Sequence, residues 1–130
     1  MQTKTFIIAF LITLMGFSPA LLADDFSESS FVPGFEDIPL MEGMSLAEDG
    51  TMSFDSPEGR FIQVYMSASP KASKVDITKF YEESLPPLGW QQKNGKQKSC
   101  YLREDEQLCI DISGTKPPFA VRFELKTVQK

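Results

Sequence analysis

The chain has 130 residues, with 18 acidic and 13 basic side chains and a formal net charge of −5. This length suits one domain with one modest core, and the acidic balance argues against nucleic acid and anionic membranes as partners, because both attract clustered lysine and arginine. The chain has no histidine, which excludes Ser–His and Cys–His nucleophilic pairs and removes the commonest zinc ligand.

Residues 1–23 have the three-part pattern of a secretory signal peptide. A single positive charge precedes an apolar run at residues 6–17, and small residues follow it. Cleavage is expected after Ala23, with cleavage after Ala20 as the alternative. An uncleaved anchor is a further alternative, which Pro19 and the lack of a basic flank disfavour. The sequence therefore predicts export to the periplasm or secretion, with no stable membrane anchor after cleavage.

Residues 24–50 are expected to form an irregular N-terminal arm, because acidic residues, serine, proline and glycine follow one another there without a period. The folded domain is predicted to span residues 51–130. It begins with two strands within residues 51–67, separated by the turn sequence Ser-Pro-Glu-Gly at residues 56–59.

A helix of about 12 residues is predicted after the Pro70 break. Ser73 and Asp76 have the spacing of a capping box, and Pro86 and Pro87 cannot continue the helical hydrogen bonds. One apolar stripe recurs at steps of three and four residues: Ile77, Phe80, Tyr81, Ser84, Leu85 and Leu88.

Four more strands are predicted after the helix. The dipeptide Asn94-Gly95 is a strong signal for a two-residue hairpin turn, and a turn centred there pairs Trp90 with Ser99. A second turn at residues 103–106 and a loop at residues 114–118 separate the remaining strands. The predicted order is β-β-α-β-β-β-β, an α+β domain with a single helix packed on one face of a mainly antiparallel sheet.

The two cysteines, Cys100 and Cys109, are predicted to face each other across the second hairpin. If its turn is centred between Glu104 and Asp105, opposed residue numbers sum to 209, which pairs the cysteines at a distance that permits a disulfide. A structural disulfide is therefore expected in an oxidising compartment. A redox-active pair and half of a metal site are the alternatives, but the spacing and the missing histidine favour neither.

The same pairing rules predict the two faces of the sheet. The core is expected on the face of Trp90 and Tyr101, with the disulfide on the other. The helix-free face then carries apolar residues that form a possible docking surface: Met52, Phe54, Phe61, Tyr65 and Leu102. A second apolar face is usually covered. The first hypothesis is that the N-terminal arm covers it, and the second is that it is exposed for docking.

The stretches "FDSPEGR" and "FYEESLPPLGW" resemble a group of small, uncharacterised exported bacterial proteins. The resemblance covers roughly the last 75 residues. Its "FY…L…GW" element also occurs in other envelope domains, including outer-membrane assembly lipoproteins, although this chain has no lipid-bearing cysteine near the cleavage site. The resemblance implies a fold and a location in the cell envelope, and it implies no catalytic residue or ligand.

We expect a non-catalytic binding or accessory module of the cell envelope that acts through protein contacts, as a monomer. The alternative is a small inhibitor or ligand-binding domain that uses surface loops such as residues 114–118. No catalytic residue, metal site or cofactor is predicted. An enzyme would depend on paired carboxylates, and the acidic runs at residues 82–83 and 104–106 are more typical of solvated surfaces.

Overall fold

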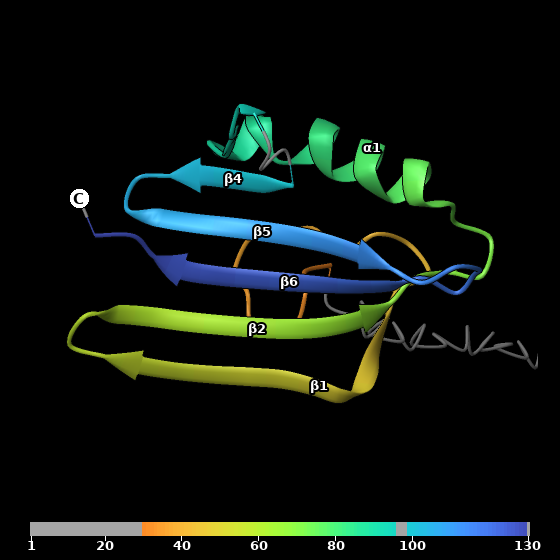
Figure 1. The fold of residues 1–130 in the computed structure, drawn as a ribbon, viewed down its shortest axis with the longest axis horizontal. Helices are drawn as coiled ribbons and strands as arrows, with labels where there is room; N and C mark the ends of the chain where they lie inside the picture. Colours follow the sequence, from red (N-terminus) through yellow and green to blue (C-terminus); the bar gives the residue numbers. More distant parts are fainter. Residues whose placement is uncertain (1–29, 96–98, 130) are drawn as a thin grey trace, which may run out of the picture.

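The computed structural model describes residues 30–95 and 99–129, so the expected signal peptide and the start of the arm lie outside the described residues. The predicted α+β fold is confirmed: a helix packs on one face of an antiparallel sheet, with strand order β1-β2-β6-β5-β4-β3 (Figure 1). The elements are β1 (Ser45–Ser56), β2 (Gly59–Ser67), α1 (Lys74–Ser84), the 3-10 helix η1 (Pro86–Leu88), β3 (Gln91–Gln92), β4 (Cys100–Arg103), β5 (Glu106–Ser113) and β6 (Ala120–Thr127).

The capping box at the start of α1 is confirmed. The Ser73 hydroxyl accepts a hydrogen bond from the Asp76 amide at 3.0 Å, and the Asp76 carboxylate accepts one from the Ser73 amide at 2.8 Å. These bonds stabilise the ionised carboxylate and hold the pKa of Asp76 below its usual value. The helix buries Ile77 and Tyr81 against the sheet and ends just before the two prolines.

The N-terminal segment, residues 30–44, packs on the same face of the sheet as α1. Figure 1 shows it in orange, running behind the strands. The Phe35 ring meets the Phe123 ring edge-on at 6.3 Å, and the Tyr81 hydroxyl donates to the Pro39 carbonyl at 3.0 Å. For these residues, the hypothesis that the arm covers the helix-free face is wrong. The arm is also shorter than expected, because β1 begins at Ser45.

The size of the helix explains why residues 30–44 pack on the same face as α1. An 11-residue helix is about 16 Å long. It lies over β4 and β5 and reaches β6 through Tyr81, whose ring meets the Phe123 ring at 5.3 Å. It therefore leaves the inner face of β2, and part of that of β6, to be covered by another segment. That inner face is continuously apolar through Ile62, Val64 and Phe123. Val32 and Ile38 are fully buried in the same core, because exposing this surface to water would be more costly than exposing the mixed surface on the other side.

The predicted register of the Asn94-Gly95 hairpin is wrong by four residues. β3 pairs with β4 so that Gln91 lies opposite Leu102, which places Trp90 beside Arg103 and not opposite Ser99. The connection runs from residue 94 to residue 99 and is therefore longer than a two-residue turn; residues 96–98 lie outside the described part. Because four is an even number, Trp90 still faces the core, where it is 1% exposed.

Candidate functional site

The helix-free face of the sheet carries all five residues of the predicted docking surface. Strand pairing places Phe54, Phe61 and Leu102 in one row across the sheet, with Lys126 and Gln107 between them. Leu102 is three strands from Phe61, about 14 Å away at the usual spacing between strands. The five residues therefore share one face but do not form one continuous patch.

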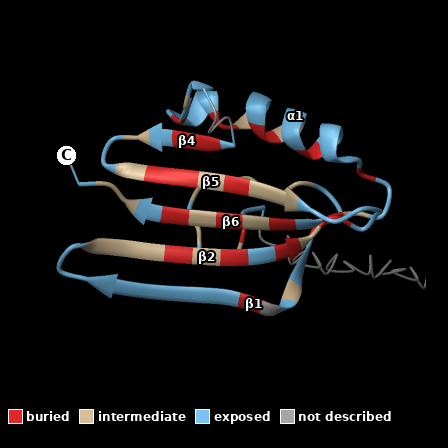
Figure 2. Cartoon of the chain, viewed as in Figure 1, coloured by how far each residue is buried: buried red, intermediate tan, exposed pale blue. Residues whose placement is uncertain are grey.

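The apolar part of this face lies on β1 and β2. Met52 and Phe54 are each more than half exposed, at 55% and 54%. Phe54 stacks on Phe61 across the hairpin, with ring centroids 5.1 Å apart and an interplanar angle of 24°. Together with Met52, this stack forms the apolar part of the helix-free face. Figure 2 shows that β1 is exposed along most of its length.

A polar stripe crosses the middle of the same face. Gln63 on β2 donates to the Glu124 carboxylate on β6 at 3.2 Å. Arg122 on β6 is ion-paired with Asp111 on β5, and this hydrogen-bonded carboxylate raises the pKa of the Arg122 guanidinium. Tyr65 lies beside Arg122 in the strand pairing. The surface thus offers hydrogen-bonding groups next to the aromatic stack, as protein-binding surfaces commonly do.

The predicted disulfide is confirmed. Cys100 and Cys109 are paired residues of β4 and β5, with Cα atoms 4.1 Å apart, and a covalent bond joins their sulfur atoms. The hairpin turn is centred between Glu104 and Asp105, as the predicted register requires. The side chain of Gln107 donates to the Cys109 sulfur at 3.3 Å. Both sulfur atoms are therefore used in a disulfide bond that links β4 to β5.

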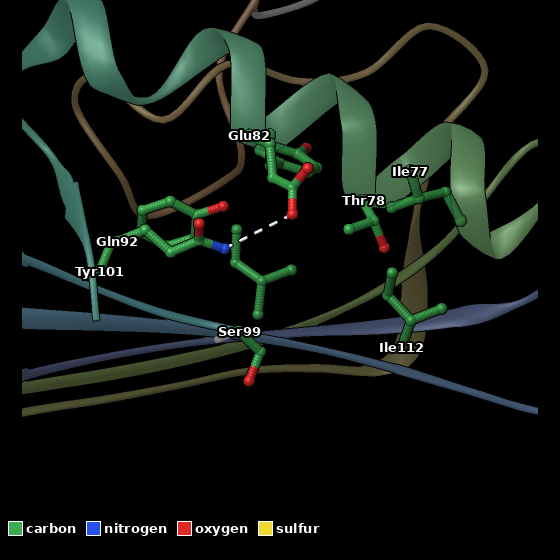
Figure 3. Close-up of a pocket in the computed structure, with 9 residues that line it drawn as sticks. Ile77, Thr78, Glu82, Gln92, Ser99, Tyr101 and Ile112 are labelled. Atoms are coloured by element: carbon green, nitrogen blue, oxygen red, sulfur yellow. Dashed lines mark hydrogen bonds between the residues drawn. The ribbon is translucent and has the colours of Figure 1, made fainter. Parts of the chain in front are cut away.

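A cavity between α1 and the sheet was not predicted from the sequence. Its volume is about 290 Å³, and Figure 3 shows its lining side chains. Gln92 donates to the Glu82 carboxylate at its rim, at 3.5 Å. Burial raises the pKa of the Tyr101 phenol, and the charge of Glu82 raises it further. The lining residues are Ile77, Thr78, Tyr81, Glu82, Gln92, Ser99, Tyr101, Ile110 and Ile112.

Two residues that line the cavity, Thr78 and Glu82, could have been identified from the sequence. They are one helical turn apart, on the border of the apolar stripe of α1, so they sit where the helix meets the sheet. The depth of the cavity could not be predicted from the sequence, because it depends on the distance between the helix and strands β4 and β5. The cavity has apolar walls and a polar rim, and its volume lies just below the usual range for small-molecule sites.

Within residues 30–95 and 99–129, the cysteine and acidic side chains form no group of three that could hold a metal ion. No helix in this part of the chain is both long and apolar enough to cross a bilayer. Comparison with protein-family models, curated proteins and solved structures found no match to this chain.

Proposed function

We propose that this protein is an exported, non-catalytic binding module of the bacterial cell envelope. It acts by contact with another envelope protein, and the contact surface is the helix-free face of the sheet. The observation that carries this proposal is the placement of Met52, Phe54, Tyr65 and Leu102. All four are more than a third exposed on a face that no described element covers.

The position of the N-terminal segment supports this choice of surface. Residues 30–44 contribute to the core on the opposite face, through Val32, Ile38 and Met44. The stack of the exposed Phe54 on the half-buried Phe61 is therefore not covered by this segment. Large exposed apolar groups rimmed by polar residues are typical of protein contact sites.

The chemistry of the chain supports a role without catalysis. It has no histidine, and both cysteines are joined in the disulfide. The nucleophile–base pairs that depend on these residues therefore cannot form. The disulfide also supports export, because such bonds persist in oxidising compartments. The resemblance of the C-terminal part to small exported bacterial proteins agrees with this location.

Export is tested by the intact mass of the protein recovered from its native host. We expect the mass of a chain that begins at Asp24, or at Leu21 if the alternative site is used. A full-length chain retained in the membrane fraction would contradict the proposed location.

The contact surface is tested by site-specific photocrosslinking in the native host. A photoreactive phenylalanine analogue replaces Tyr65 or Leu102, which are exposed on the helix-free face at separate positions. The matched control is Val75, which is 74% exposed on α1. We expect both test positions to capture the same envelope protein and the control position to capture none. Addition of Phe61→Glu should abolish that capture without unfolding the domain.

Two results would contradict the proposed contact surface. One is the absence of any crosslinked protein at both test positions when expression and export are normal. The other is equal capture at Val75, which would show that the contact is not selective for the helix-free face.

The cavity beneath α1 supports a second candidate function, the binding of a small ligand. This site differs from the surface loop at residues 114–118 that the sequence suggested for a ligand. A ligand with an apolar body and a positively charged end would match the apolar walls and the Glu82 carboxylate at the rim.

Benzylamine is a suitable probe for this second function, and NMR titration is the measurement. Binding in the cavity should shift the resonances of Ile110 and Ile112, and Glu82→Gln should weaken binding by about tenfold, the effect of losing one charged contact. Shifts spread over the whole surface, or an unchanged affinity in Glu82→Gln, would exclude the cavity as the site.

A further inference from the structure

Strand β1 forms one edge of the sheet. It pairs with β2 on one side, and no strand in the described part of the chain pairs with it on the other. Residues 51–56 of β1 are all exposed (Figure 2). An edge strand of this kind presents unpaired backbone N–H and C=O groups, which can pair with the strand of another chain.

The register of the first hairpin identifies these groups. Ser56 and Gly59 flank a two-residue turn, so they form a hydrogen-bonded pair, and such pairs recur at every second residue. Phe54 therefore directs its backbone groups toward β2, whereas Ser53 directs its groups outward. The amide of Arg60 supports this alternation, because it donates to the Thr127 hydroxyl on β6 at 3.1 Å and not to β1.

Residues 51–56 of this edge have little of the usual protection against strand pairing, because Asp55 is their one charged side chain. Natural edge strands are often blocked by lysine, proline or a bulge. Residues 51–56 contain neither lysine nor proline, and their pairing with β2 is regular. The irregularity of β1 lies between Leu46 and Thr51, outside this stretch. A regular six-residue edge with three outward-directed residues, Thr51, Ser53 and Asp55, is thus available.

We propose that β1 pairs with β1 of a second copy of this chain, antiparallel and about a two-fold axis at Ser53. In this register Thr51 lies opposite Asp55 of the other copy, and Ser53 lies opposite its own equivalent, so all outward-directed backbone groups can form hydrogen bonds. Met52 lies opposite Phe54 of the other copy, in the closely spaced type of pair. Two-fold symmetric pairs are the commonest form of oligomer.

The side chains of β1 support pairing with a second copy of this chain in this register. Met52 and Phe54 are both on the helix-free face, so each thioether would rest against an aromatic ring of the other copy, which is a favourable contact. No acidic residue faces another within residues 51–55. A two-fold axis at Met52 would extend the pairing into the irregular segment before Thr51. An axis at Phe54 would bring Pro57, which has no N–H group, into the pairing.

The pairing would join the helix-free faces of two copies into one surface of twice the width. This inference differs from the monomer expected from the sequence, in which a pattern of alternating residues does not indicate which strand lies at the edge. It does not depend on the proposed envelope partner, since it concerns the purified protein alone.

Sedimentation velocity of the purified exported protein, from about 1 to 300 µM, tests the inference. We expect a monomer–dimer equilibrium. Ser53→Pro removes an outward-directed N–H that is not used for pairing with β2, and it should weaken dimer formation at least tenfold. Ser53→Ala, which retains the N–H, is the matched control and should dimerise like the unchanged protein.

The register is tested separately by Ser53→Cys, which also avoids any folding defect of the proline variant. The paired Cα atoms at the axis would be about 5.5 Å apart, within disulfide range, so mild oxidation should link two copies. Ser56→Cys, three residues along the same strand, should not link. A purely monomeric protein at 300 µM, a dimer that Ser53→Pro leaves unchanged, or equal linking through residue 56 would overturn the inference. None of these results bears on crosslinking to an envelope partner through Tyr65 or Leu102.

Discussion

The guanidinium of Arg103 lies over the indole of Trp90, with its central carbon 4.2 Å from the centre of the ring. The same guanidinium is ion-paired with Asp37 and donates to the Leu88 carbonyl at 3.2 Å. One side chain of β4 thereby holds together the N-terminal segment, the turn after α1 and the buried tryptophan. This junction is where the helix layer and the sheet meet.

Trp90→Ala should lower the free energy of unfolding by about 3–5 kcal/mol, because the large side chain is buried and its loss leaves a cavity. Trp90→Phe, which retains an aromatic ring in the site, should be less destabilising. Urea denaturation followed by circular dichroism measures both. In the unchanged protein, acrylamide should quench the fluorescence of this single tryptophan only weakly; strong quenching would contradict its burial.

The double change Cys100→Ser and Cys109→Ser should lower the free energy of unfolding by about 2–4 kcal/mol. Closure of a ten-residue loop accounts for about 2.7 kcal/mol in the chain-entropy description. The fold should persist, because the disulfide lies on the opposite face from the main core. Urea denaturation gives the magnitude. Free-thiol labelling of the unreduced native protein should find no thiol, and labelling of either cysteine would contradict the structure.

Tyr81 should make the protein sensitive to alkaline pH. Burial raises the pKa of its phenol above the usual value of about 10, so the folded state retains the proton at a pH where the unfolded state has lost it. The stabilisation is therefore fully present below pH 10 and is lost as the pH rises above it, by up to about 1.4 kcal/mol per pH unit.

Tyr81→Phe is the matched variant for this pH dependence. It should be less stable at pH 7 by about 1 kcal/mol, because it loses the hydrogen bond to the Pro39 carbonyl. Its stability should also fall less steeply between pH 10 and 11. Urea denaturation at pH 7, 10 and 11 is the measurement. An equal slope in both proteins would show that Tyr81 does not titrate differently in the folded state.

Ile38→Asp should unfold or severely destabilise the domain, by more than about 3 kcal/mol, because it places an unpaired charge in the core beneath the N-terminal segment. Met52→Asp is the control, with the same change of chemistry at a site that is 55% exposed on the other face. It should alter stability by less than about 0.5 kcal/mol. Equal stability of the two variants would mean that residues 30–44 are not part of the core.

The local signals of the sequence led to correct predictions where the interacting residues are close along the chain. Ser73 and Asp76 are three residues apart, so the capping box depended on no distant contact. The turn between β4 and β5 similarly determined that Cys100 meets Cys109. In each case the hydrogen-bonding or steric preference of a few residues decides the geometry, and the rest of the fold only has to accommodate it.

At Asn94-Gly95 the observed strand pairing differs from the one that the local turn preference predicts. The turn signal of this dipeptide is strong, yet β3 and β4 pair four residues out of the predicted register. The observed pairing places Trp90 beside Arg103, which stacks on the indole. A tertiary contact of this kind can outweigh a turn preference, and the even shift leaves the alternation of faces unchanged. The prediction of the core therefore remained correct although the register was wrong.

The sequence by itself determined the composition of the two sheet faces, the helix and the disulfide, because each follows from periodicity or short spacing. Only the tertiary structure decided which face residues 30–44 cover, which strand lies at the edge and where a cavity remains beneath α1. These outcomes depend on competition between distant surfaces for burial. The short helix left part of a continuous apolar face to be covered, and the N-terminal segment covers it, whereas the mixed face of Phe54, Phe61 and Tyr65 can remain in contact with water.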